Sequence, residues 1–80
     1  MPTTTTFQTL QPEEPGARVR LSRKALGVTQ QQLADLTSVS RQTIISMETG
    51  AYAPSVYLAL KVAHHLETTV EALWGELTNS

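Results

Sequence analysis

Apolar residues recur along most of the chain at spacings of three and four positions. The clearest case lies near the C-terminus, where Val70, Leu73, Trp74 and Leu77 stand at i, i+3, i+4 and i+7. This spacing places apolar side chains on one face of an α-helix. From Pro15 onward, no run of strand length combines Val or Ile enrichment with strict apolar and polar alternation. The pattern therefore predicts an all-α chain.

The first two helices have clear start and stop signals. We expect the first to begin at Pro15, whose fixed φ suits the first helical position. It should end at Gly27, because glycine accepts the left-handed conformation that follows a helix. The second begins at the capping-box pattern Thr29-x-x-Gln32 and runs to about Leu36.

Three more helices begin at hydroxyl side chains that can accept a bond from a free backbone N–H. They run from Ser40 to Gly50, from Ser55 to Leu66, and onward from the capping-box pattern Thr68-x-x-Glu71. We expect each helix to be about 8–12 residues long, which is too short for stability in isolation. The helices must therefore bury their apolar faces against one another.

The expected fold is a compact five-helix bundle formed by residues 15–78. Nothing repeats at a fixed interval of about 20–50 residues, which excludes a solenoid. The predicted core residues are Val19, Leu26, Leu33, Ala34, Leu36, Ile44, Met47, Val56, Leu60, Ala63, Leu66 and the stripe at positions 70–77.

Residues 1–14 differ from the rest in composition, being rich in threonine and proline with Phe7 and Leu10 as their large apolar groups. Two interpretations remain open for this arm. A polar, proline-containing terminus does not repay its ordering entropy, which favours disorder. However, Thr5, Phe7 and Thr9 alternate with neighbours on the opposite face, which favours a short strand that pairs with a second subunit.

Length and composition exclude several classes of protein. Eighty residues suffice for one small domain, and the absence of cysteine excludes a disulfide framework. The apolar runs are far shorter than the ~20 residues needed to cross a bilayer. Residues 1–10 lack the charged start and apolar stretch of a signal peptide. We therefore expect a soluble, cytoplasmic protein with no membrane partner.

Charge is distributed unevenly along the chain. The net formal charge of −1 argues against a nucleic-acid partner, yet residues 17–61 carry +4 between flanking segments of −2 and −3. A basic segment between acidic ends favours a side that faces a polyanion. The alternative is an ordinary solvated face.

Catalytic and metal chemistry find little support. His64 and His65 are adjacent, so on a helix their side chains point about 100° apart, whereas chelation from one helix needs spacings of three or four. Half-buried packing, or titration on a dimer face, explains them better. No nucleophile, histidine and acid are placed together, and no glycine-rich loop precedes a helix. We expect no enzyme activity, no metal and no cofactor.

The most specific signal lies in residues 29–50, where two capped helices are separated by three or four residues. So short a turn sets the helices steeply across each other, and the small Ala34 allows close approach to Ile44. This predicts a helix-turn-helix. The second helix of such a pair can lie in the major groove with its N-terminal residues at base edges.

Residues 19–74 closely resemble the Cro/repressor-type, or XRE-type, helix-turn-helix regulators of phages and bacteria. The motifs VTQQQLA, VSRQTI, E-x-G at Glu48 to Gly50, Pro54-Ser55, LALKVA and VEALW occur in the family's order and spacing. The chain is most similar to short, stand-alone members. The resemblance implies a repressor that binds a palindromic operator on double-stranded DNA as a homodimer, through the recognition helix at residues 40–49.

The resemblance also implies roles for individual side chains. Arg41 and Gln42 match positions that read bases, and their geometry suits guanine and adenine respectively. Gln30 matches a glutamine that holds phosphate and braces the recognition helix. The remaining implied base-reading residues are Thr43, Ile45 and Ser46, and the remaining implied phosphate contacts are Thr29, Ser40, Tyr52 and Ser55. For Thr43, contact with phosphate and contact with a thymine methyl both remain open. For Ile45, contact with a thymine methyl and packing on the preceding helix both remain open.

Structural and dimer roles are implied as well. Arg23 and Glu48 match a salt bridge between the first and third helices, while Ser38 stands where relatives have glycine. Trp74, Leu77 and Phe7 are dimer-interface candidates, although the first two also fit an ordinary core. Because Ala51 and Ala53 supply no cations, we also keep a rival hypothesis, a protein-binding adaptor or antitoxin-like module on the same fold.

Overall fold

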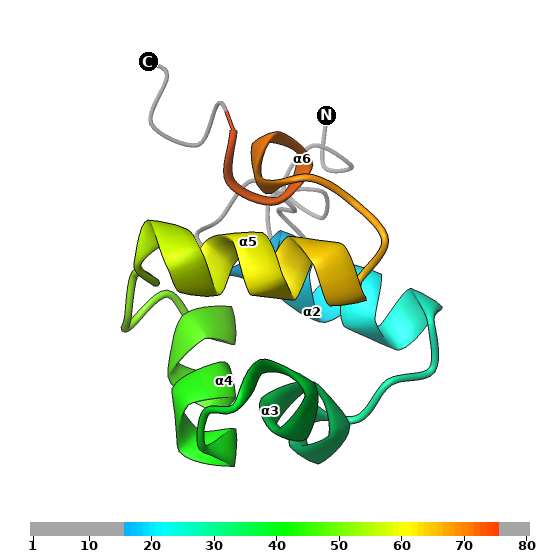
Figure 1. Cartoon of the computed structure of the whole chain (residues 1–80), viewed down its shortest axis with the longest axis vertical. Helices are drawn as coiled ribbons and strands as arrows, with labels where there is room; N and C mark the ends of the chain where they lie inside the picture. The colour runs from blue at the N-terminus through cyan, green and yellow to red at the C-terminus, as the bar shows by residue number, and fades with distance from the viewer. Residues whose placement is uncertain (1–15, 76–80) are drawn as a thin grey trace, which may run out of the picture.

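The computed structural model describes residues 16–75, and these form α-helices without any strand (Figure 1). The five helices are α2 (Ala17–Ala25), α3 (Gln30–Thr37), α4 (Arg41–Glu48), α5 (Val56–His65) and α6 (Val70–Trp74). The all-α prediction is therefore confirmed. The expected arm at residues 1–14, the predicted start at Pro15, and Leu77 lie outside the described residues. None of the helices among residues 16–75 combines the length and the apolar character that spanning a bilayer requires.

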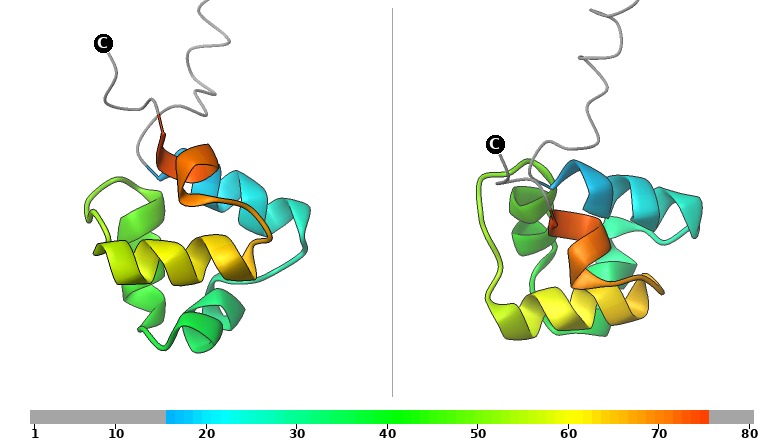
Figure 2. Two further views of the ribbon diagram at one scale, coloured as in Figure 1. Left: turned by 45° about the horizontal axis from the view of Figure 1, so that its top comes forward. Right: turned by 90° about the horizontal axis from the view of Figure 1, so that it is seen from above.

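The helices are arranged around α2 and α5, which run through the middle of the bundle (Figure 1). The α3–α4 pair packs on one side of them, with α3 against α5 and α4 against α2. On the other side, α6 lies across both α2 and α5, as the view from above in Figure 2 shows. Arg18 fastens this end of the bundle, because its Nη1 donates to the carbonyl oxygens of Ala72 and Gly75 at 3.1 Å each.

Local capping determines where three helices begin, as the sequence predicted. Both bonds of the Thr29 capping box form, since Thr29 Oγ1 accepts from the Gln32 N–H at 3.0 Å and the Thr29 N–H donates to Gln32 Oε1 at 2.8 Å. Ser40 and Ser55 accept from the N–H three residues later, at 3.1 Å each. These bonds satisfy backbone donors that have no partner within the helix.

The fifth helix departs from the prediction at its start and in its length. The Thr68 N–H donates to the Ala63 carbonyl at 2.9 Å and so closes the end of α5. The cap therefore falls on Thr69, whose Oγ1 accepts from the Ala72 N–H at 3.0 Å. Because Gly75 has extended backbone with ψ 145°, α6 ends after 5 residues and does not reach the expected minimum of about 8.

The end of α2 confirms the role of Gly27, which has a φ of 72°. The Val28 N–H donates to the Arg23 carbonyl and the Gly27 N–H to the Lys24 carbonyl, both at 3.0 Å. This is the Schellman arrangement, which satisfies carbonyls at the end of a helix.

The core confirms most predicted residues and corrects four of them. Val19, Leu33, Ala34, Ile44, Met47, Ala63, Leu66 and Leu73 are buried, whereas Leu26, Leu36, Val56 and Leu60 are exposed. Two apolar stripes run along α5, and periodicity alone could not rank them. The bundle buries the stripe formed by Leu58, Ala59, Val62, Ala63 and Leu66. The competing stripe with Val56 and Leu60 therefore faces outward.

Ser38 takes the left-handed conformation at the end of α3, with φ 63° and ψ 40°. This conformation costs a residue with a side chain about 1–2 kcal/mol. Glycine avoids that cost, but it loses more conformational entropy on folding, which offsets part of the gain. We expect Ser38→Gly to raise the free energy of unfolding by about 0.5–1 kcal/mol. Urea unfolding measures the change. Ser22→Gly, inside α2, is the matched control and should lower stability, whereas destabilisation by Ser38→Gly would contradict the prediction.

Candidate nucleic-acid interface

The interface candidate is built on the turn between α3 and α4. Residues 38–40 make this turn, and the Val39 N–H donates to the Ala34 carbonyl at 3.0 Å to close α3. Ala34 and Ile44 are both fully buried in the common core, as the sequence predicted for the crossing of the two helices. The turn and the crossing hold α4 against α3 with one face of α4 turned outward.

That outward face of α4 carries the predicted base-reading residues. Ile44, Met47 and Glu48 are buried, and they define the inward side of the helix. Arg41 and Gln42 are exposed, and the Gln42 Nε2 donates to Ser46 Oγ at 3.3 Å along the surface. Thr43, Ile45 and Ser46 are half-buried at the edges of the face. Ile45 is not among the residues of the apolar core, so its side chain lies at the boundary of the exposed face.

Most of the predicted phosphate-contacting residues lie at helix N-termini. Thr29, Ser40 and Ser55 cap α3, α4 and α5, and all three are exposed. Ser40 Oγ also lies 2.9 Å from Thr43 Oγ1, so these two hydroxyls share a hydrogen bond. Tyr52 is 43% exposed in the loop before α5. Backbone N–H groups and the dipole at a helix start favour an anion, which makes these positions chemically suited to phosphate.

A buried ion pair connects α4 to α2. Arg23 Nε and Nη2 donate to Glu48 Oε2 at 2.6 Å and Oε1 at 3.1 Å, and the two side chains are 8% and 2% exposed. Gln30 Nε2 donates to the same Glu48 Oε1 at 3.2 Å. Glu48 therefore connects α4 to both α2 and α3. Gln30, of which the resemblance implies both phosphate contact and bracing, therefore contacts the last residue of α4.

The sequence indicates no site role for Arg20 or Lys24, yet both line a groove with four residues for which it does indicate one: Arg23, Thr29, Gln30 and Arg41. This groove runs between α2 and the starts of α3 and α4. The spacing of four between Arg20 and Lys24 placed them on one side of a helix. The sequence carried no sign that this side would meet Arg41, which is 17 residues beyond Lys24.

Of the three dimer-interface candidates, only Trp74 lies among the described residues. Trp74 is half-buried at the end of α6, while Leu77 and Phe7 lie outside the described residues. Trp74 lines an apolar pocket of about 260 Å³ together with Ala53, Pro54, Val56, Ala59 and Val70. An apolar pocket at the surface fits a packing contact better than a polar ligand.

The two histidines lie at the end of α5. Their ring centroids are 5.1 Å apart in an edge-to-face arrangement, and His64 is exposed while His65 is half-buried. Among residues 16–75, no group of three His, Cys, Asp or Glu side chains is placed to hold a metal ion.

Comparison with known proteins identifies the family. A helix-turn-helix family model matches residues 19–73. An HTH-type transcriptional regulator of Methanothermobacter thermautotrophicus is 50% identical over 48 residues, which are 60% of this chain and 70% of that protein. The HTH-type transcriptional regulator YgzD of Bacillus subtilis is 35% identical over 63 residues, which are 78% of this chain and 96% of that protein.

Solved structures agree with the sequence matches. The restriction-modification controller protein C.AhdI from Aeromonas hydrophila is 30% identical with a TM-score of 0.71, covering 84% of this chain and 98% of that one. The DNA-binding domain of the P22 c2 repressor is 26% identical with a TM-score of 0.71, covering 89% of this chain and 92% of that one. The chain therefore belongs to the XRE-type helix-turn-helix family of transcriptional regulators.

Proposed function

We propose that this DNA-binding regulator is a repressor that binds a palindromic operator as a homodimer, with α4 in the major groove. The observation that carries the proposal is the outward face of α4, where Arg41, Gln42 and Ser46 stand opposite the buried Ile44 and Met47. An arginine can pair with guanine O6 and N7, and a glutamine with adenine N6 and N7. Thr43 and Ile45 flank this face and complete the proposed base-reading set.

The proposed phosphate contacts surround α4 and fix its position on the duplex. Thr29 and Gln30 lie at the start of α3, Ser40 at the start of α4, and Tyr52 and Ser55 before α5. Such contacts carry no sequence information themselves, but they set the register of the recognition helix. Repression would follow because an occupied operator blocks promoter DNA.

The homodimer follows from the geometry of palindromic recognition. Two copies related by a two-fold axis would place their α4 helices about 34 Å apart, one turn of the duplex. Trp74 beside its apolar pocket is the proposed contact within the described residues, and Leu77 and Phe7 remain proposed contacts outside them. The structurally similar C.AhdI and P22 c2 proteins are a controller protein and a repressor, which supports a role in regulation.

Selection of bound sequences from a random pool of duplex DNA tests this function directly. We expect an inverted repeat that binds at least about a thousandfold more tightly than scrambled DNA. A selected site without two-fold symmetry would overturn the homodimer on a palindrome. Weak binding that disappears with salt and shows no selected sequence would overturn specific readout.

Gln42→Ala tests the role of α4 in reading bases. Because Gln42 is exposed and alanine favours helix, the fold should be retained. We expect the variant to lose about 1–3 kcal/mol of discrimination at one base pair of each half-site. Titration of the selected site and of its single-base variants measures this loss.

Gln31→Ala is the matched control, since Gln31 is also exposed but its Nε2 donates to Asp35 Oδ1 within α3. The control should keep the base preference of the wild-type protein. Equal base preference in Gln42→Ala and wild type would show that Gln42 does not read a base.

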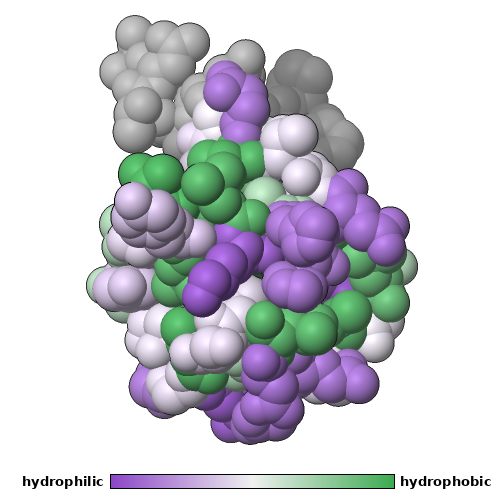
Figure 3. Space-filling view, in the orientation of Figure 1, coloured by the Kyte–Doolittle hydropathy of each residue, from purple (hydrophilic) through white to green (hydrophobic). Residues whose placement is uncertain are grey.

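One observation favours the rival function, a protein-binding adaptor. On α5, Val56, Tyr57 and Leu60 are exposed to 72%, 81% and 54%. Figure 3 shows apolar and polar side chains side by side on the face over which α5 runs. Exposed apolar side chains of this size are typical of protein contacts. If no sequence is selected from a random DNA pool, the protein-binding function is favoured over sequence-specific DNA binding.

A further inference from the structure

The basic residues of the described chain fall into two groups. Arg18 donates to carbonyl oxygens at the end of α6, and Arg23 is buried against Glu48. The other four are exposed and have no ion-pair or hydrogen-bond partner for their side chains among residues 16–75: Arg20, Lys24, Arg41 and Lys61. These four are the cations that remain available to a ligand.

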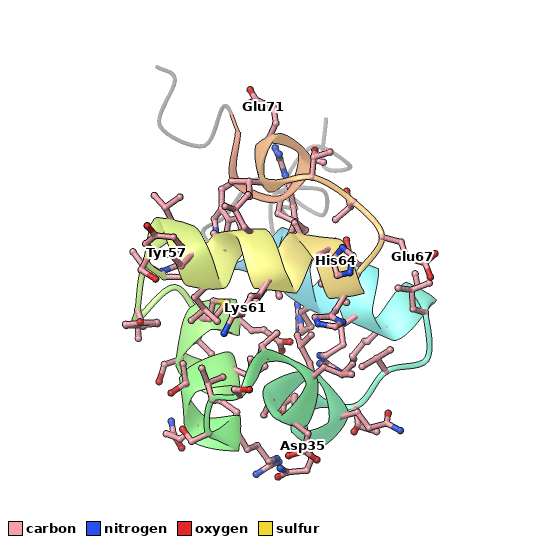
Figure 4. The ribbon with its side chains drawn as sticks, in the orientation of Figure 1. Asp35, Tyr57, Lys61, His64, Glu67 and Glu71 are labelled. Atoms are coloured by element: carbon pink, nitrogen blue, oxygen red, sulfur yellow. The ribbon has the colours of Figure 1, made fainter. Side chains whose placement is uncertain are left out.

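Three of the four available cations line a single groove. Arg20 and Lys24 enter it from successive turns of α2, and Arg41 enters from the start of α4. The groove has a volume of about 610 Å³, and Thr29, Gln30 and Gln31 line its third side at the start of α3. We call it the basic groove. Lys61, the fourth cation, projects from α5 instead (Figure 4).

No acidic residue lines the basic groove. Glu48 is buried, and its carboxylate accepts hydrogen bonds from two residues of the groove, Arg23 and Gln30. Of the other acids of the described residues, Asp35 on α3 accepts a hydrogen bond from the groove-lining Gln31, Glu67 follows the end of α5, and Glu71 lies on α6 (Figure 4). Cations gathered in a concave surface without acids attract anions more strongly than the net charge of the chain suggests.

We propose that the basic groove binds the phosphate backbone of duplex DNA, with Arg20 and Lys24 as phosphate contacts. This inference rests on the proposed function and adds two residues to its interface. Gln30 and Arg41 line the basic groove, so a strand held by Gln30 beside α4 passes along it. The loop before α5 has Ala51 and Ala53 and offers no cation. In this proposal, the positive charge that holds the DNA backbone beside α4 comes from Arg20 and Lys24 on α2, and not from the loop.

The test compares the salt dependence of binding to the selected operator. In the variant Arg20→Gln with Lys24→Gln, both changes lie on the exposed side of α2 and retain good helix formers. Each phosphate contact contributes about 0.9 to the slope of log K against log salt concentration. We expect the magnitude of this negative slope to decrease by about 1.8 per subunit, while the selected sequence stays the same.

Lys61→Gln is the matched control, because it removes an equally exposed cation outside the basic groove. Its slope should equal that of the wild-type protein. A wild-type slope in the double variant, or the same decrease in Lys61→Gln, overturns the basic groove as the phosphate site and leaves the proposed function standing. Failure of the wild-type protein to select any DNA sequence overturns the proposed function and this inference with it.

Discussion

Replacing Glu48 by glutamine should lower the free energy of unfolding by about 3–5 kcal/mol. The Arg23 guanidinium donates to Glu48 through Nε and Nη2, and both side chains are almost completely buried. Glutamine keeps the shape of Glu48 but removes its charge, which leaves Arg23 charged and uncompensated. Urea unfolding followed by the fluorescence of Trp74, the single tryptophan of the chain, measures the loss.

A double variant tests whether the loss comes from the uncompensated charge of Arg23. Arg23→Met combined with Glu48→Leu removes both charges and places apolar side chains of similar size in the same space. Because desolvation of a buried pair offsets much of its attraction, the double variant should lose much less stability than Glu48→Gln. A loss below about 1 kcal/mol in the single variant would contradict a structural role for the pair.

We expect the ion pair to affect DNA binding as well, because Glu48 is the last residue of α4, the proposed recognition helix. A carboxylate at a helix C-terminus meets the negative end of the helix dipole, and Arg23 compensates for this. Gln30 donates to the same carboxylate from α3. Loss of the Glu48 carboxylate would therefore remove one polar contact between α4 and each of these two neighbours, and operator affinity should fall together with stability.

Gly16→Ala should destabilise the protein by more than the about 1–2 kcal/mol that a left-handed alanine costs by itself. Gly16 has a φ of 86°, and a Cβ built there would lie 2.0 Å from the Met47 carbonyl oxygen and 2.7 Å from that of Glu48. These are backbone atoms at the end of α4, which cannot turn aside as a flexible side chain could. The variant must push α2 away from α4 or fail to fold.

Gly27→Ala separates the two contributions to this effect. Gly27 also has a positive φ, 72°, but nothing lies within 4 Å of a Cβ built there. Its replacement by alanine should cost only the free energy of the left-handed conformation, about 1–2 kcal/mol. Urea unfolding measures the loss of stability in both variants. Equal losses would show that the close approach of Gly16 to α4 does not affect stability.

Sequence reasoning was most accurate where the cause is local. Thr29, Ser40 and Ser55 cap helices through bonds to N–H groups three residues away, so a short window of sequence contains both partners. Gly27 likewise ends α2 through backbone bonds within five residues. The prediction at Thr68 was wrong because its N–H is already used by the end of α5. Thr68 carries the local capping-box signal because Glu71 follows three residues later, yet the bond that closes α5 places the cap on Thr69.

The all-α class, the helix-turn-helix at residues 29–50 and the family could all be predicted from the sequence, because periodicity, caps and motif spacing are properties of short segments. Which stripe of α5 is buried, and the meeting of Arg20, Lys24 and Arg41 around the basic groove, depend on how the helices pack. Burial depends on which surfaces meet, and meeting surfaces come from residues far apart in the chain. A pattern within one helix gives the direction of a side chain relative to its neighbours, but packing of the other helices determines what that side chain faces.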